Sequence, residues 1–204
     1  MADRKGRSRK GKGSKGPEAI VVRDARTADL SALLEIYNDV VLKSSATFDL
    51  APLTLVQRKK WFEEHSGRYP LVVAENKGRV VGYASLSEFR DKPGYSKSAE
   101  DSVYVHNGFQ GKGVGTLLMK EILSRAAGLG YHTIIAAIVP PNEASVRLHE
   151  GFGFTYVGNF REVGFKFSRW QDVSFYQLFI TRTHLGLSSG SPSSRGLTIE
   201  SGNA

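Results

Sequence analysis

Hydrophobic and polar positions follow two different periods along this chain. In residues 30–41 the apolar side chains recur about every 3.6 positions, which is typical of an amphipathic helix with one buried face. Residues 113–129 show a similar spacing, and residues 54–66 and 142–150 predict two shorter helices. Short apolar runs predict strands at 19–23, 71–75, 79–87, 99–106, 133–139, 156–160 and 173–181.

The order of these elements predicts the class of fold. Along the chain come a strand, two helices, three strands, a helix, a strand, a helix and two strands. The run 133–139 is apolar throughout, as expected of a strand that is buried on both faces. The polar segments 44–52 and 88–98 predict loops. This order is typical of a mixed α/β domain whose helices pack on a strongly twisted sheet.

The positive charge of the chain is concentrated at its N-terminus. Residues 1–16 contain seven lysines and arginines against one aspartate, and the rest of the chain holds only a small part of the formal net charge of +8. The folded part therefore does not resemble a nucleic-acid-binding domain. We predict a disordered basic tail at 1–17, one domain at 18–185 and a low-complexity tail at 186–204. We expect a cytoplasmic protein; the basic tail leaves nuclear localisation, or contact with nucleic acid through the tail, as alternatives.

The residue types present exclude several kinds of chemistry. The chain has no cysteine, which excludes disulfides, cysteine-ligated zinc, iron–sulfur clusters and a cysteine nucleophile. The longest strictly apolar run, 134–139, is far too short to span a bilayer, so we expect no membrane partner. We also expect no metal.

The most informative segment joins the predicted strand 99–106 to the next helix. Its glycines alternate with other residues at Gly111, Gly113 and Gly115. Glycines let the backbone turn N–H groups toward a ligand, and a helix start adds unpaired donors and a partial positive charge, so the combination is typical of a phosphate site. The alternative is a loop that only turns the chain. A dinucleotide fingerprint is excluded because Thr116 occupies the place of its third glycine.

The spacing Gln110-x-x-Gly113-x-Gly115 resembles the pyrophosphate loop of the GCN5-related N-acetyltransferases. The helix predicted at 142–150 resembles the next helix of that superfamily. The resemblance is closer still to the phosphinothricin N-acetyltransferase branch, and it covers roughly residues 20–180. The segments that carry it are 45–48 (SATF), 100–105 (EDSVYV), 141–150 (PNEASVRLHE) and 164–173 (GFKFSRWQDV).

The resemblance implies a mostly antiparallel twisted sheet, flanked by helices, with a central splayed pair of parallel strands. It also implies acetyl-CoA as the donor, a primary amine as the acceptor, and a homodimer. The residues that it implies for acetyl-CoA binding are Val103, Tyr104, Val105, Gln110, Gly111, Lys112, Gly113, Val114, Gly115, Thr116, Asn142 and Ser145.

Two residues are candidates for the chemistry. An ammonium group has no lone pair with which to attack a thioester, and Glu100 could take its proton as a general base. The alternative for Glu100 is an exposed residue at a strand start. At the position of His149 the wider superfamily often has a tyrosine that acts as general acid, whereas this branch has histidine. His149 could therefore protonate the leaving thiolate or form a hydrogen bond with the acceptor. The alternative is a histidine that only packs within the helix. With no cysteine and no serine triad, we expect direct transfer in a ternary complex.

The sequence is compatible with several acceptors. The candidates for lining its pocket are Phe48, Arg90, Pro93, Gly94 and Tyr95, although Pro93-Gly94 also predicts a simple turn. The leading hypothesis is an N-acetyltransferase for a small amino-acid-like acceptor such as phosphinothricin, methionine sulfone or methionine sulfoximine. The alternatives are a protein or peptide N-acetyltransferase, and a non-catalytic acetyl-CoA-binding module docked by its basic tail.

Overall fold

The computed structural model describes residues 20–65 and 67–181 of the chain. The predicted tails at 1–17 and 186–204 lie outside these residues, so their boundaries stay predictions. Within the described part, seven strands form one sheet in the order β1-β2-β3-β4-β5-β7-β6. The strands are β1 (Val21–Asp24), β2 (Leu71–Asn76), β3 (Arg79–Glu88), β4 (Ser98–Val105), β5 (Thr133–Ile138), β6 (Thr155–Lys166) and β7 (Arg169–Phe179).

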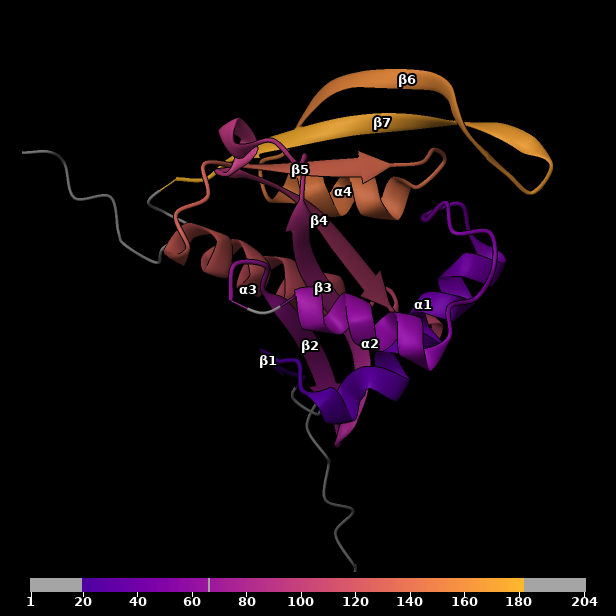
Figure 1. Cartoon of the computed structure of the whole chain (residues 1–204), viewed down its shortest axis with the longest axis vertical. Coiled ribbons are helices and arrows are strands. Elements are labelled where there is room, and N and C mark those ends of the chain that lie inside the picture. Colours follow the sequence, from indigo (N-terminus) through magenta and orange to yellow (C-terminus); the bar gives the residue numbers. More distant parts are fainter. Residues whose placement is uncertain (1–19, 66, 182–204) are drawn as a thin grey trace, which may run out of the picture.

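Among the described residues, four α-helices cover the sheet (Figure 1). They are α1 (Leu30–Lys43), α2 (Leu55–Glu64), α3 (Val114–Gly128) and α4 (Glu143–Gly151). Helix α2 begins as its sequence dictates, because Thr54 and Gln57 form a reciprocal capping box. Short 3₁₀ turns lie at Thr27–Asp29, Pro93–Tyr95 and Asn107–Phe109.

The core divides into two clusters because neighbouring strand residues point to opposite faces of the sheet. Val73 packs with Leu33 of α1 on one face. Val72, one position earlier, packs with Leu118 of α3 on the other face. The element order and the mixed α/β class expected from the sequence are therefore confirmed.

Strands β4 and β5 form the one parallel pair among these strands, and they separate after three residues. Their register ends where Glu100 lies opposite Ile135, although β4 continues to Val105 and β5 to Ile138. All other strand pairs are antiparallel. The splayed parallel pair implied by the sequence resemblance is thus confirmed, and Glu100 lies at the fork.

The β6–β7 hairpin is longer than the sequence predicted. Its strands continue through residues 161–172, and Phe167 and Ser168 form the turn with positive φ angles. Register shifts between Tyr156 and Gly158, and between Phe160 and Gly164, interrupt the alternation that marks a strand. These irregularities conceal the extension in the sequence. The part of β7 that precedes Ser174 has no partner in β5, so this end of the hairpin projects past β5 (Figure 1).

Candidate active site

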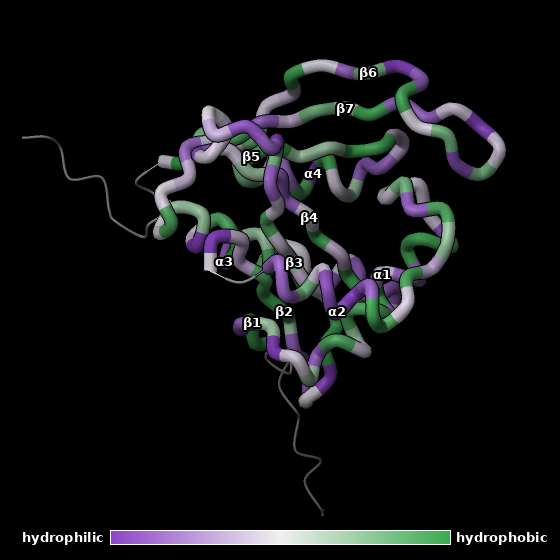
Figure 2. The backbone as a smooth tube through the Cα atoms, in the orientation of Figure 1, coloured by the Kyte–Doolittle hydropathy of each residue, from purple (hydrophilic) through white to green (hydrophobic). Residues whose placement is uncertain are grey.

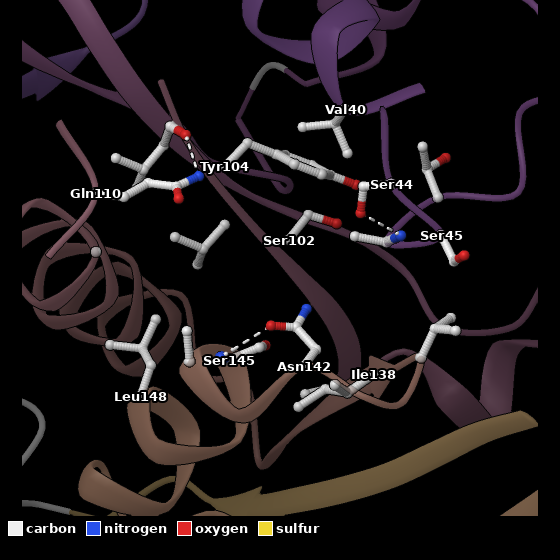
Figure 3. A pocket seen from close by; sticks show the side chains of 18 of the residues that line it. Val40, Ser44, Ser45, Ser102, Tyr104, Gln110, Ile138, Asn142, Ser145 and Leu148 are labelled. Atoms are coloured by element: carbon white, nitrogen blue, oxygen red, sulfur yellow. Dashed lines mark hydrogen bonds between the residues drawn. The ribbon is translucent and has the colours of Figure 1, made fainter. Parts of the chain in front are cut away.

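A pocket of about 1140 Å³ opens where β4 and β5 diverge. Figure 3 shows Ser102 and Tyr104 of β4 on one side of this space, with Asn142 and Ser145 on the other. The structure brings most of the sequence-predicted residues together around it. These are Phe48, Glu100, Val103, Tyr104, Val105, Gln110, Gly111, Gly113, Val114, Gly115, Thr116, Asn142, Ser145 and His149.

The glycine loop presents the start of α3 to the pocket. Gly111 and Gly113 have φ angles of +70° and +78°, in the left-handed region that favours glycine. Gly113 is the N-cap residue of α3 and no side chain caps the helix, so its first N–H groups remain free for an anion. Gln110 Nε2 donates to the carbonyl of Val105 (3.3 Å), whereas Lys112 Nζ turns back to the carbonyl of Gly108 (2.8 Å). Lys112 is not among the lining residues.

The edges of the two diverging strands supply backbone groups. Residues 101–105 of β4 pair with β3 on one side and with no described strand on the other. Across the gap, Asn142 Oδ1 accepts a hydrogen bond from the backbone N–H of Ser145 (3.2 Å), which makes Asn142 the N-cap of α4. Its amide nitrogen points into the pocket (Figure 3). Asn142 can therefore cap the helix and still donate to a ligand.

Glu100 is a partly buried carboxylate at the fork. It forms no hydrogen bond or ion pair with a described residue. Burial, followed by the charge of Asp101, raises the pKa of Glu100 above its usual 4.5, while the charge of Arg90 lowers it. A carboxylate with a raised pKa accepts a proton more readily, which suits a general base.

His149 belongs to a buried pair that the sequence reasoning missed. Its Nδ1–H donates to the carbonyl of Ser145 (2.7 Å), and Nε2 lies 3.1 Å from Oδ2 of Asp101. Burial alone would lower the pKa of His149, but the hydrogen bond and charge of Asp101 outweigh it and raise the pKa. Both ring nitrogens therefore have partners within the protein. Strand alternation was the available signal, because it places Asp101 on the face opposite to Glu100, toward α4.

The predicted acceptor residues are divided between two places. Phe48 lines the pocket, whereas Arg90, Pro93, Gly94 and Tyr95 do not. Pro93–Tyr95 forms a 3₁₀ turn, and Tyr95 contacts Phe89 edge to face with ring centroids 5.6 Å apart. Arg90 lies close enough to Glu100 for its charge to lower the pKa of that carboxylate.

The described residues contain neither a candidate membrane-spanning helix nor a candidate metal-binding cluster. None of their helices is long and apolar enough to cross a membrane. No group of three or more histidine, aspartate and glutamate side chains among them could hold a metal ion.

Comparison with known protein families identifies the class of enzyme. The family model described as "Acetyltransferase (GNAT) domain" matches residues 22–175. The chain belongs to the GNAT acetyltransferase family. The family and the enzyme class expected from the sequence, an acetyltransferase, are thereby confirmed.

Several GNAT relatives are similar to this chain over nearly their whole length. The L-methionine sulfoximine/L-methionine sulfone acetyltransferase of Pseudomonas aeruginosa is 40% identical over 79% of this chain and 95% of the relative. The phosphinothricin N-acetyltransferase of Streptomyces coelicolor is 41% identical over 79% and 97%. A phosphinothricin acetyltransferase from Sinorhizobium meliloti, solved in complex with acetyl-CoA, is 34% identical with a TM-score of 0.77, covering 86% of this chain and 94% of its own.

Proposed function

We propose that this GNAT protein transfers the acetyl group of acetyl-CoA directly to the primary amine of a small amino-acid-like acceptor. The observation that carries the proposal is the fork between β4 and β5, where a carboxylate with a raised pKa shares one pocket with an open helix N-terminus. Acetyl-CoA as the co-substrate agrees with the S. meliloti complex.

The two ends of the pocket have different roles in this proposal. The N–H groups at Gly113 and the following residues hold the pyrophosphate, because a helix start favours negative charge. The pantetheine arm lies along the edge of Val103–Val105 that pairs with no described strand, and the amide of Asn142 contacts it from the opposite side. The thioester then lies near Glu100 at the fork.

The proposed reaction needs one base and one proton for the leaving group. Glu100 takes a proton from the acceptor ammonium, and the freed nitrogen attacks the thioester carbon. The tetrahedral intermediate collapses and releases the thiolate of CoA, which takes the second proton of the attacking nitrogen, so that a neutral amide and free CoA are formed. Donation by His149 requires its Nε2–H to leave Asp101, so we assign it first to holding α4 at the pocket.

The relatives support the class of acceptor. The P. aeruginosa and S. coelicolor proteins are named for methionine sulfoximine, methionine sulfone and phosphinothricin, all of them small amino acids. Acceptor kinetics test this assignment: methionine sulfone and a peptide that begins with methionine are compared at saturating acetyl-CoA. The proposal predicts a higher kcat/KM for the free amino acid. A preference for the peptide would favour a protein N-acetyltransferase instead.

We also propose that the chain forms a homodimer through the β6–β7 hairpin. Figure 2 shows hydrophobic and hydrophilic segments along this hairpin, and Phe160, Phe165 and Trp170 are each more than half exposed. A second copy would cover these rings, whose exposure is unusual for apolar side chains in a monomer. Sedimentation equilibrium should give the mass of two chains, and the mass of one chain would contradict the proposal.

A further inference from the structure

The loop between α1 and α2 forms one wall of the pocket. Its residues Ser44 to Phe48 line the same space as Glu100. The loop contains no helix or strand of its own, so contacts with other elements must determine where the wall lies.

The first of these contacts ties the backbone of the loop to β6. Lys166 is only 3% exposed, and its Nζ donates to the carbonyl of Thr47 (2.8 Å). From the other side, the hydroxyl of Tyr37 in α1 lies 2.8 Å from Oγ1 of Thr47 and donates to Oδ2 of Asp49 (2.7 Å). The loop is thus held between a helix that adjoins it and a strand more than one hundred residues later in the chain.

The second contact places the ring of Phe48 directly on the backbone of Gly164. A methyl group added at Gly164 would lie 2.8 Å from Cε2 of the ring and closer still to Cε1 and Cζ. Carbon atoms do not approach so closely, so any side chain at Gly164 must displace the ring. The φ angle of Gly164 is outside the left-handed region, and the space taken by the ring is therefore the reason for glycine here.

We propose that the β6–β7 hairpin determines acceptor selectivity through two positioning residues, Gly164 and Lys166. Gly164 leaves room for the Phe48 ring to pack on its backbone, and Lys166 holds the backbone of Thr47 by a hydrogen bond. The hairpin thereby determines the width of the pocket beside Glu100. This inference rests on the proposed function, because it assigns the wall to the acceptor. The glycine loop that begins α3 takes no part in either contact.

The test compares Gly164→Ala with Gly158→Ala, a matched control in the same strand. A methyl group at Gly158 meets no atom within 4 Å. We expect Gly164→Ala to raise the KM for methionine sulfone about tenfold or more, the usual cost of a displaced pocket contact. Calorimetry should find its affinity for acetyl-CoA unchanged. The control should match the wild type in both measurements.

A double variant shows whether Gly164→Ala raises the KM by displacing the Phe48 ring or by disrupting the fold in general. Phe48→Leu removes the ring, so adding Gly164→Ala to it should raise the KM much less than Gly164→Ala does alone. Lys166→Arg, which can still donate a hydrogen bond, should retain more acceptor affinity than Lys166→Met. Equal kinetics of the two alanine variants, or independent penalties in the double variant, would overturn the proposal.

Hydrogen exchange gives a readout that does not depend on activity. In Gly164→Ala and Lys166→Met, the amides of residues 44–49 should exchange faster than in the wild type, with α3 unchanged. If the wild type acetylates no amino acid but this exchange pattern appears, the proposed function fails while the positioning of the wall stands. If the wild type acetylates methionine sulfone, but neither the hydrogen exchange nor the KM changes in these variants, the inference about the hairpin fails and the proposed function stands.

Discussion

Replacing Glu100 by glutamine removes the charge at the fork and keeps the size of the side chain. The side chain of Glu100 forms no hydrogen bond with a described residue, so glutamine disrupts none. Its raised pKa means that the protonated carboxyl stabilises the fold at low pH, and that this contribution is lost as pH rises through the folded-state pKa. At neutral pH the variant should therefore be at least as stable as the wild type, and lost activity would not reflect unfolding.

The rate should fall by about 10²–10⁴-fold, the usual worth of a general base. This corresponds to roughly 2.7–5.4 kcal/mol at about 1.36 kcal/mol for each tenfold change. Acetyl-CoA affinity should remain near the wild-type value, because the proposed pyrophosphate site at the start of α3 does not include Glu100. The defect should shrink as pH rises, since more of the acceptor amine then arrives without its proton.

Thiol release from acetyl-CoA, followed from neutral to alkaline pH, measures these effects. Glu88→Gln is the matched control, because Glu88 is an exposed carboxylate at the end of β3 and outside the pocket. Full activity of Glu100→Gln would refute the assignment of the base. A higher KM whose penalty does not fade at high pH would instead show that Glu100 holds the acceptor ammonium.

Three further predictions concern the cofactor loop, the buried pair and the tails. Gly113→Ala places a side chain at a backbone φ of +78°, which costs about 1–2 kcal/mol. Calorimetry should show acetyl-CoA binding weakened by the equivalent, roughly 5–30-fold. The control Gly128→Ala should bind acetyl-CoA as the wild type does. Asp101→Asn should lower the pKa of His149 in an NMR titration. The raised pKa of His149 stabilises the fold fully below pH 6.5, and this contribution is lost as pH rises through the folded-state pKa. The melting temperature of Asp101→Asn should therefore fall most, relative to the wild type, at acidic pH. A shortened chain of residues 17–185 should keep the kcat of the full chain.

Local patterns were enough to predict most elements of the fold. Apolar spacing indicated α1 and α3, and the glycine pattern indicated the open start of α3, to which we assign the pyrophosphate. The fork could not be derived from periodicity, because it depends on where the pairing of β4 with β5 stops; it was expected only from the family resemblance.

The contacts that were missed join residues far apart in the chain. Lys166 and Thr47 are separated by 119 positions, and no local pattern links them. Asp101 was overlooked beside Glu100 because its partner, His149, is on a different element 48 positions later. The bulges of β6 also concealed the strand that carries Gly164 and Lys166. The sequence therefore indicated the residues of the proposed cofactor end, whereas the contacts made by Lys166 and Asp101 were visible only in the structure.

The most direct test of the proposed function uses acetyl-CoA carrying a ¹³C label in its acetyl carbonyl, with methionine sulfone as the acceptor. Mass spectrometry and NMR of the products identify the atom that receives the label. The proposal predicts N-acetyl-methionine sulfone labelled at its amide carbonyl, formed in step with free CoA. Binding of acetyl-CoA without transfer to this or any other amino acid would contradict it, and so would release of CoA with labelled acetate as the only product.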